Sequence, residues 1–409
     1  MPSSQSSSGT ELQFLVLADD RTGALETAGI CADAGWGPVP VVVGNISLVP
    51  NSITVVDMGT RHLAPSSAAQ RITAIDSSVC RRVALKIDST LRGNWATELV
   101  ALHRLLGQRV VLVPAFPAVG RICRNGEVLE HDRPVTEGTG RSDARSIVRS
   151  SRPAEHLRAA GASEVAELAG VAELVTWLAS GTNGVAVCDA QNDADLRALA
   201  EVWSATENIV FAGTAGSIGA AAMILGLKSQ PPNSFAWPIA RTALRPPLPL
   251  PAIIVCGSLH AAARRQIEHL KNAPIATAVT VLASSLPDVT PVSTGSAQEV
   301  AAELKARYER AIASSPSPSS PSSPSSPSSP SSPSSPVLSG PSDPVRTVVI
   351  IGGDTAAAIL DNESVVVEGT VGPGMPWIRR TDGTLLVTRA GGFGTESSLV
   401  DLFSARMER

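Results

Sequence analysis

Polar side chains that could bind a ligand are concentrated between Val83 and Asn94. Residues 83–87 form an apolar run typical of a short buried strand. The polar residues in and after this run are Lys86, Asp88, Ser89, Thr90 and Arg92. Cations and hydroxyl donors pair with carboxylate oxygens, so this set suits an anionic, hydroxyl-rich ligand. A simple helix cap explains any one of these residues but accounts poorly for five polar groups around one turn.

Aspartates also follow two other predicted strands of the first half. Phe14–Ala18 is followed by Asp19 and Asp20, and Ile53–Val56 is followed by Asp57. If the sheet is parallel, these ends and Asp88 lie at one edge, where open α/β sheets bind their ligands. Carboxylates at such an edge bind hydroxyls or magnesium, or accept a proton. Each aspartate alone could cap a helix, but their recurrence favours a site that includes Thr22 and Arg61 just beyond the strand ends.

Apolar runs alternate with helical patterns, which predicts two α/β domains, each with a mostly parallel sheet flanked by helices. Between Asn125 and Ser151 the sequence predicts a long polar loop, and Val165–Ala179 a helix. A proline-rich stretch marks the domain junction, and a serine–proline repeat is expected to be a disordered insertion. The predicted division is a disordered tail at 1–11, a first domain at 12–240, a linker at 241–251, and a second domain at 252–409 with the insertion at 315–344.

In the second half, three strands are followed by turns of small residues and then by helical patterns. These turns are Gly257-Ser258, Gly352 to Thr355, and Gly391 to Gly394. Helix N-termini present unpaired N–H groups, and glycine lets a phosphate approach the backbone, so together the turns could hold a triphosphate. Ser258 and Thr355 supply hydroxyls, and Asp354 could help to hold magnesium. No single turn is specific, and neither a P-loop nor a GxGxxG fingerprint occurs.

The composition excludes several classes of protein. Hydrophobic residues make up 43% of the 409 residues and charged residues 17%, as in globular proteins. The net charge of −4 and the 3% of aromatic residues argue against a nucleic-acid partner. No apolar run approaches the roughly 20 residues of a membrane span, and no secretory signal is evident, so we expect a cytoplasmic protein without a membrane partner. Five scattered cysteines disfavour disulfides and structural zinc.

The ordered motifs DDRTGA, KIDSTLRGN, PAFPAVGR, GS, GGDT, GPGMP and GGFG resemble those of the four-carbon acid sugar kinases, over about Phe14 to Leu402. The resemblance implies ATP-dependent phosphorylation of the terminal hydroxyl of erythronate, threonate or 3-oxo-tetronate. It further implies an N-terminal domain for the acid sugar and a C-terminal domain for the nucleotide. Implied substrate-side residues are Asp19, Asp20, Thr22, Lys86, Asp88, Ser89 and Arg92, and implied ATP-side residues are Ser258, Gly352, Gly353, Asp354, Thr355, Gly391 and Gly392. Departures from the family pattern are Arg21, Asp354 and Arg389-Ala390.

These assignments predict a kinase with its active site in the cleft between the domains, with ATP and Mg²⁺ as cofactors. Arg92, with Lys86 or Arg61, would neutralise the substrate carboxylate or the transferring phosphate. Asp20 or Asp88 would orient or deprotonate the attacking hydroxyl, and Asp19 would bind substrate hydroxyls. A non-catalytic sugar-acid sensor is the alternative, and a dehydrogenase is disfavoured by the missing dinucleotide fingerprint. Whether the chain forms a homo-oligomer stays open.

Overall fold

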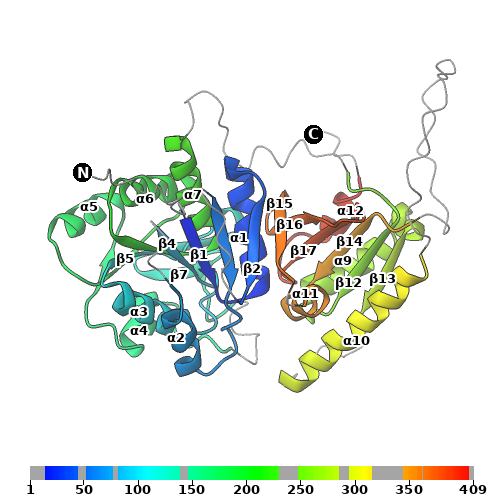
Figure 1. The fold of residues 1–409 in the computed structure, drawn as a ribbon, viewed down its shortest axis with the longest axis horizontal. Helices are drawn as coiled ribbons and strands as arrows, with labels where there is room; N and C mark the ends of the chain where they lie inside the picture. The colour runs from blue at the N-terminus through cyan, green and yellow to red at the C-terminus, as the bar shows by residue number, and fades with distance from the viewer. Residues whose placement is uncertain are drawn as a thin grey trace, which may run out of the picture. The chain divides into compact units, whose positions relative to one another are not determined.

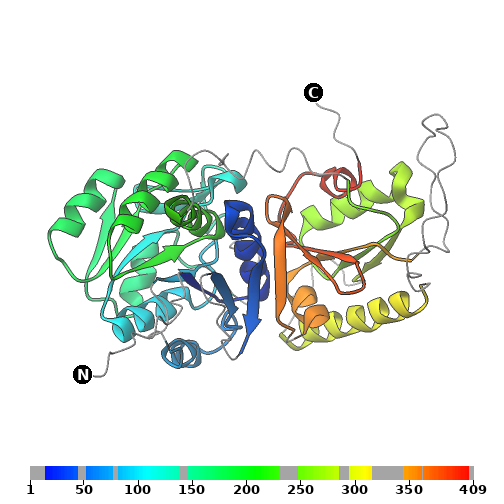
Figure 2. The ribbon, with the colours of Figure 1, turned by 45° about the horizontal axis from the view of Figure 1, so that its top comes forward.

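The computed structural model describes residues 14–44, 52–76, 82–138, 146–229, 247–284, 294–315, 344–361 and 363–404. The predicted N-terminal tail and most of both the linker and the serine–proline insertion lie outside these residues. The described residues form two compact units (Figures 1 and 2). Unit 1 falls within Met1–Thr242 and Asn362–Pro376, and unit 2 within Ala243–Asp361 and Trp377–Arg409.

Unit 1 is built on a twisted, mostly parallel sheet with the strand order β15-β2-β3-β1-β4-β11-β5-β10-β9. All neighbouring pairs are parallel except β15 and β2. The strands of this sheet are β1 (Phe14–Ala18), β2 (Val39–Val43), β3 (Ile53–Asp57), β4 (Val83–Lys86), β5 (Arg109–Val113), β9 (Val165–Leu168), β10 (Val185–Cys188), β11 (Ile209–Gly213) and β15 (Val365–Gly372).

Helices cover both faces of this sheet, which explains why its central strands are continuous apolar runs. The sequence FLVLA of β1 is buried at every position. Helices α1, α5, α6 and α7 lie on one face and α2, α3 and α4 on the other (Figures 1 and 2). Their bounds are α1 (Arg21–Cys31), continued by a π-helical turn (Ala32–Trp36), α2 (Pro65–Thr73), α3 (Trp95–Leu106), α4 (Pro153–Ala159), α5 (Val171–Ala179), α6 (Asp193–Ala205) and α7 (Ala215–Ser229).

The predicted loop between Asn125 and Ser151 is wrong in its first part, where the chain forms a small antiparallel sheet. A short 3₁₀ turn (Pro117–Val119) leads into it, and its strands are β6 (Arg121–Arg124), β7 (Glu127–Glu130) and β8 (Arg133–Pro134). Asn125 and Gly126 form the β6–β7 turn, and both have positive φ. Asp189 accepts hydrogen bonds from both of their backbone N–H groups, at 2.5 and 2.9 Å. This carboxylate, at the end of β10, therefore anchors a hairpin.

Unit 2 has a smaller sheet with the order β13-β12-β14-β17-β16, parallel except for β16 against β17. Helices α9 and α12 pack together on one face, and α10 and α11 on the other (Figure 2). The bounds are β12 (Ala252–Cys256), α9 (Ala261–Lys271), a 3₁₀ turn (Pro274–Ala278), β13 (Val279–Ala283), α10 (Thr294–Ala313), β14 (Thr347–Ile351), α11 (Gly353–Leu360), β16 (Met375–Arg379), β17 (Leu385–Arg389) and α12 (Ser398–Asp401).

Two further expectations differ from the structure. Residues 165–168 form strand β9, not the start of a helix, because they pair with β10 at the edge of the sheet. Residues 363–376 belong to unit 1, not to the second domain, because β15 pairs with β2. Within the described part of the chain, no helix has both the length and the apolar character needed to cross a membrane.

Candidate active site

Three aspartate-bearing strand ends meet at one edge of the unit 1 sheet, as the sequence predicted. Ala18, the last residue of β1, lies in register with Asp57 of β3 and with Lys86 of β4. All three strands are parallel, so the residues that follow them leave the sheet at its carboxyl edge. Asp19 and Asp88 therefore come close together although 69 positions separate them in the sequence.

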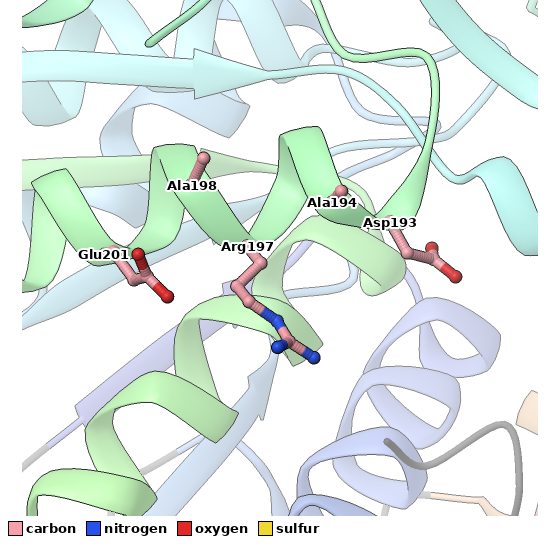
Figure 3. Close-up of a pocket in the computed structure, with 5 residues that line it drawn as sticks. All are labelled: Asp193, Ala194, Arg197, Ala198 and Glu201. Atoms are coloured by element: carbon pink, nitrogen blue, oxygen red, sulfur yellow. The ribbon is translucent and has the colours of Figure 1, made fainter. Parts of the chain in front are cut away.

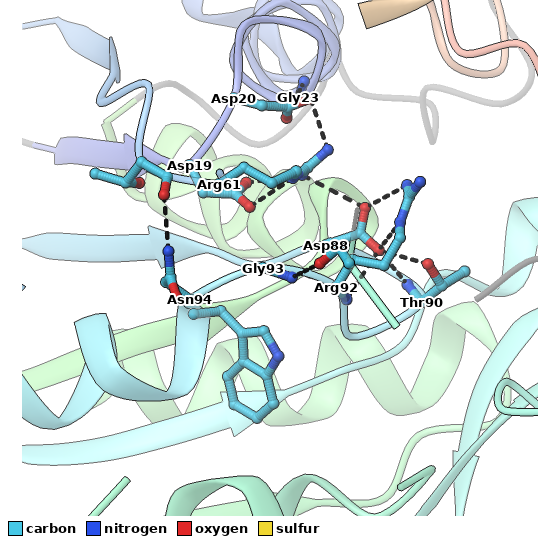
Figure 4. Close-up of polar contacts among 12 residues, drawn as sticks. Asp19, Asp20, Gly23, Arg61, Asp88, Thr90, Arg92, Gly93 and Asn94 are labelled. Atoms are coloured by element: carbon cyan, nitrogen blue, oxygen red, sulfur yellow. Dashed lines mark hydrogen bonds and ion pairs between the residues drawn. The ribbon is translucent and has the colours of Figure 1, made fainter. Parts of the chain in front are cut away.

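Arg61 lies at the centre of this group (Figure 4). Its Nε and Nη2 atoms donate to the two carboxylate oxygens of Asp19, both at 2.8 Å, and its Nη1 atom donates to Asp20 at 2.7 Å. Nη2 also lies 3.4 Å from an oxygen of Asp88. The backbone N–H groups of Thr60 and Arg61 donate to the carbonyl of Asp19 and fix the loop that carries the guanidinium. One side chain therefore joins three carboxylates.

Asp88 is the acceptor that shapes the KIDSTLRGN turn. It receives hydrogen bonds from the backbone N–H and hydroxyl of Thr90, at 2.9 and 2.5 Å, and from Nε and Nη2 of Arg92, at 3.0 and 2.7 Å (Figure 4). Leu91 takes a positive φ of 66° in this turn. The following helix begins only at Trp95. Asp88 therefore stabilises the turn and orients Arg92, and it does not cap the helix.

The three central groups differ in their electrostatics. Burial raises the pKa of Asp19, and the positive charge of Arg61 offsets only part of this effect. Burial also acts on Asp88, but Arg92 and Arg61 outweigh it and hold its pKa well below the usual range. Burial opposes the charge of Arg61, yet the surrounding carboxylates raise its pKa well above normal. The carboxylate of Asp88 and the guanidinium of Arg61 therefore both stay charged.

Lys86 places an ammonium group against the start of helix α1. Asp20 caps this helix and accepts a hydrogen bond from Gly23 N at 2.9 Å. A Cβ atom on Gly23 would lie 2.6 Å from an Asp20 oxygen and 2.9 Å from Lys86 Nζ. The glycine therefore makes room for both charged groups. Lys86 is only 3% exposed.

The remaining predicted substrate residues lie nearby but outside the hydrogen-bond network. The hydroxyl of Thr22 is buried and has no partner in the described part of the chain. Ser89 is half-buried, and no hydrogen bond of the network involves its side chain. Arg21, the departure from the family pattern, forms an ion pair with Asp57 at 3.9 Å and donates to the carbonyl of Glu363. Burial raises the pKa of Asp57 to about 6.

Sequence reasoning missed two buried acids, Glu26 on α1 and Glu98 on α3. Neither lies at a strand end or within a motif that signals a site, so no local pattern distinguishes them. Glu98 has no exposed surface, and neither carboxyl oxygen has a hydrogen-bond partner of acceptable geometry in the described structure. Burial and the negative charge of Asp19 raise the pKa of Glu98 to about 8 from an ordinary value of 4.5. The folded protein therefore holds a proton that the unfolded chain releases, and stability falls as pH rises between these values.

Glu98→Gln is expected to raise the free energy of unfolding at about pH 8 by up to ~5 kcal/mol, because each pKa unit corresponds to ~1.4 kcal/mol. Near pH 5 the two proteins should differ little, since Glu98 is then protonated in the folded state. Urea unfolding at both pH values measures the difference. Glu201→Gln, at an exposed acid on α6, is the control. An equal gain in the free energy of unfolding at both pH values would contradict the raised pKa of Glu98.

The three glycine turns of unit 2 also lie at one sheet edge. They follow β12, β14 and β17, which are neighbours in the sheet. The N–H of Gly352 donates to the carbonyl of Arg389 at 3.0 Å. A Cβ on Gly391 would lie 1.8 Å from Ser258 Oγ, and one on Gly257 would lie 2.1 Å from Thr355 Oγ1. The predicted hydroxyls and glycines of the nucleotide side are therefore in contact.

Two of these turns open directly into helices. Helix α9 begins at Ala261 with His260 as its cap, and α11 begins at Gly353. Gly352 has a φ of 112°, a conformation that favours glycine. Backbone N–H groups at both helix starts are suited to phosphate oxygens. Beyond Gly391–Gly394 the next helix, α12, begins only at Ser398, so that turn offers no helix N-terminus of its own.

Arg389, at the end of β17, is a further buried cation next to these turns. It has no exposed surface, and its Nη2 atom donates to the carbonyl of Phe393. Its Nε and Nη1 atoms have no hydrogen-bond partner in the described structure. Burial lowers the pKa of Arg389 to about 10. The guanidinium thus places a positive charge next to the Gly391–Gly394 turn.

A surface hollow of about 360 Å³ lies elsewhere, on the outer face of helix α6 (Figure 3). Its lining residues are Asp193, Ala194, Arg197, Ala198 and Glu201. None of these residues belongs to either predicted site, and they all come from one helix. Among the described residues, no three or more His, Cys, Asp or Glu side chains are arranged so that they could hold a metal ion.

Comparison with known proteins gives a family-model match in each half of the chain. Residues 14–221 match a sugar-binding N-terminal domain, and residues 336–399 a nucleotide-binding C-terminal domain. The D-threonate kinase of Bordetella bronchiseptica is 28% identical over 96% of this chain and 97% of its own length. The D-erythronate kinase of Heliobacterium modesticaldum is 27% identical over 63% of this chain and 60% of its own.

The fold has a counterpart among solved structures. The crystal structure of the Haemophilus influenzae protein HI1011 superposes with a TM-score of 0.60 at 17% identity, covering 95% of this chain and 98% of that one. The family match spans more than half of the chain and includes every residue of the Asp19–Arg61–Asp88 group. The chain therefore belongs to the four-carbon acid sugar kinase family.

Proposed function

We propose that this protein transfers the γ-phosphoryl group of ATP to the terminal hydroxyl of a four-carbon sugar acid, such as threonate or erythronate. One observation supports this most strongly. Unit 1 gathers carboxylates and cations that suit a hydroxy acid, and unit 2 gathers glycine turns that suit phosphates. A sensor that only binds the acid has no use for the second group.

Phosphoryl transfer depends mainly on positioning and on neutralising charge. Lys86 and Arg92 supply cations for the substrate carboxylate or the transferring group, while Arg61 holds Asp19 and Asp20 in place. In unit 2, Ser258 and Thr355 supply hydroxyls beside the glycine turns. Kinases usually bind magnesium with the nucleotide phosphates and one or two carboxylates. In this protein, Asp354 is the carboxylate that would hold it. When bound, the ion would neutralise phosphate charge.

Asp20 is better suited than Asp88 to act as the general base. Donors already surround Asp88, and its pKa is strongly lowered, so it accepts a further proton poorly. Asp20 is also the most exposed of the three carboxylates that Arg61 joins, with 20% of its side chain accessible. It can therefore face a substrate hydroxyl while it stays bound to Arg61.

Asp20→Asn is expected to lower kcat roughly 100-fold, because general-base catalysis typically contributes at least that factor. Asp88→Asn should act mainly on KM for the sugar acid, since it releases Arg92 and the Thr90 turn. Steady-state kinetics of both variants separate the two roles. Near wild-type turnover of Asp20→Asn would rule it out as the base.

The function itself is tested by measuring ADP release from ATP in the presence of each stereoisomer of threonate, erythronate and 3-oxo-tetronate. We expect one of them to stimulate ADP release far above the rate with ATP alone. Binding of a sugar acid without any ADP release would favour the sensor.

A further inference from the structure

Helix α1 presents two buried polar groups on one face. Thr22 and Glu26 are four positions apart, so their side chains are neighbours on the helix surface. Glu26 is 8% exposed and Thr22 is 9% exposed. The hydroxyl of Thr22 and the Oε1 atom of Glu26 both lack a hydrogen-bond partner in the described structure. In the described part of the chain, neither of these two atoms hydrogen-bonds to the helix backbone.

The ammonium of Lys86 lies against the first turn of the same helix, at Gly23. Burial raises the pKa of Glu26, and the positive charges of Lys86 and Arg121 oppose this effect, so the groups are close enough to interact. Yet no ion pair or hydrogen bond joins Glu26 to Lys86 among the described contacts. Helix α1 thus has a buried, unsatisfied acid on its second turn and an ammonium group packed against its first turn.

This arrangement is unfavourable unless a polar partner satisfies it. A buried hydroxyl or carboxyl oxygen without a hydrogen bond is costly, and native proteins pair almost all such groups. The fitting partner carries an oxygen that accepts from Lys86 and, a few bonds away, a hydroxyl that donates to Glu26. A short hydroxy acid has this pattern. Thr22 can donate to, or accept from, the same ligand.

We propose that Glu26, together with Thr22 and Lys86, binds a secondary hydroxyl of the sugar acid and so selects hydroxylated over deoxy acids. This inference rests on the proposed function of unit 1. Glu26 accepts the hydrogen bond from the hydroxyl on carbon 2 or carbon 3, and Lys86 pairs with a neighbouring ligand oxygen. The residue is a specificity determinant, and it takes no part in moving the phosphoryl group.

The test compares the preferred tetronate with 3,4-dihydroxybutanoate and 2,4-dihydroxybutanoate, which lack the hydroxyl on carbon 2 or carbon 3. For the wild type, the KM of one of these analogues should be on the order of 10- to 100-fold higher than the KM of the tetronate, as expected for a lost hydrogen bond to a charged group. Glu26→Leu should raise the KM for the full tetronate by a similar factor. In this variant the tetronate and that analogue should therefore have similar KM values. The KM for ATP should stay unchanged.

Glu26→Gln keeps the shape of the side chain and decides the question if the leucine variant does not fold; it should raise KM roughly 10-fold. Thr27→Val changes the same helix at a hydroxyl that donates to the carbonyl of Gly23, and it should keep wild-type discrimination. If the wild type phosphorylates no tetronate, the proposed function fails. If the wild type is active but Glu26→Gln keeps wild-type KM and discrimination, only this inference is overturned.

Discussion

Replacing Arg61 by methionine is expected to lower kcat/KM for the sugar acid on the order of 1,000-fold. The guanidinium joins Asp19, Asp20 and Asp88, and without it these carboxylates would repel one another. Removing one partner of a buried ion pair typically costs about 3–5 kcal/mol, and each ~1.4 kcal/mol corresponds to a tenfold change in rate. The loss should appear in the steady-state kinetics with saturating ATP.

Two variants make this prediction specific. Arg61→Lys keeps the charge but cannot form the forked contacts, so its activity should fall between those of wild type and Arg61→Met. Arg71→Met removes an exposed arginine of the neighbouring helix α2, whose guanidinium donates to the Met58 carbonyl at 2.5 Å, and should change activity little. Activity of Arg61→Met within tenfold of wild type would show that the three carboxylates do not need this cation.

Gly391→Ala is expected to raise the KM for ATP roughly 10- to 100-fold and to leave sugar-acid binding intact. The added Cβ would lie 1.8 Å from Ser258 Oγ and 2.5 Å from Ser258 Cβ. Rotating the hydroxyl relieves the first contact but not the second, so the backbone of one turn must move. Overpacking of this kind costs about 1–3 kcal/mol, and it displaces the N–H groups suited to phosphate.

Titration calorimetry on the full chain measures ATP and sugar acid separately. Gly383→Ala is the matched control in unit 2, because a Cβ there meets nothing within 4 Å; its positive φ costs only ~1–2 kcal/mol of strain. It should bind ATP like the wild type. Unchanged ATP affinity in Gly391→Ala, or an equal loss of sugar-acid affinity, would contradict the division of binding between the units.

The sequence predicted the strands that carry the site because their apolar runs, although short, are uninterrupted and end abruptly in polar residues. Phe14–Ala18 and Val83–Lys86 are examples. It failed for β6–β8, whose strands are short and carry charges at alternating or terminal positions. The Asn125-Gly126 pair is a strong hairpin signal, but it lies at the start of a polar stretch that predicts a loop. Strand β15 was missed because its pairing with β2 joins segments over 300 residues apart.

The parts of the candidate site that could be predicted are those encoded by contiguous stretches of sequence. The strand-end aspartates and the KIDSTLRGN turn are contiguous patterns, so their residue types were evident. The central position of Arg61 depends on three strand ends meeting, which no local pattern encodes. Glu26, Glu98 and Arg389 lie within or at the end of ordinary elements, and only their burial distinguishes them.

The central claim is that this protein phosphorylates the terminal hydroxyl of a four-carbon sugar acid with ATP. It is tested most directly by ³¹P and ¹³C NMR of the product formed from ATP and the preferred tetronate. We predict a single phosphomonoester whose phosphorus couples to carbon 4, together with stoichiometric ADP. Phosphate on another carbon, or only inorganic phosphate alongside unchanged sugar acid, would contradict the account.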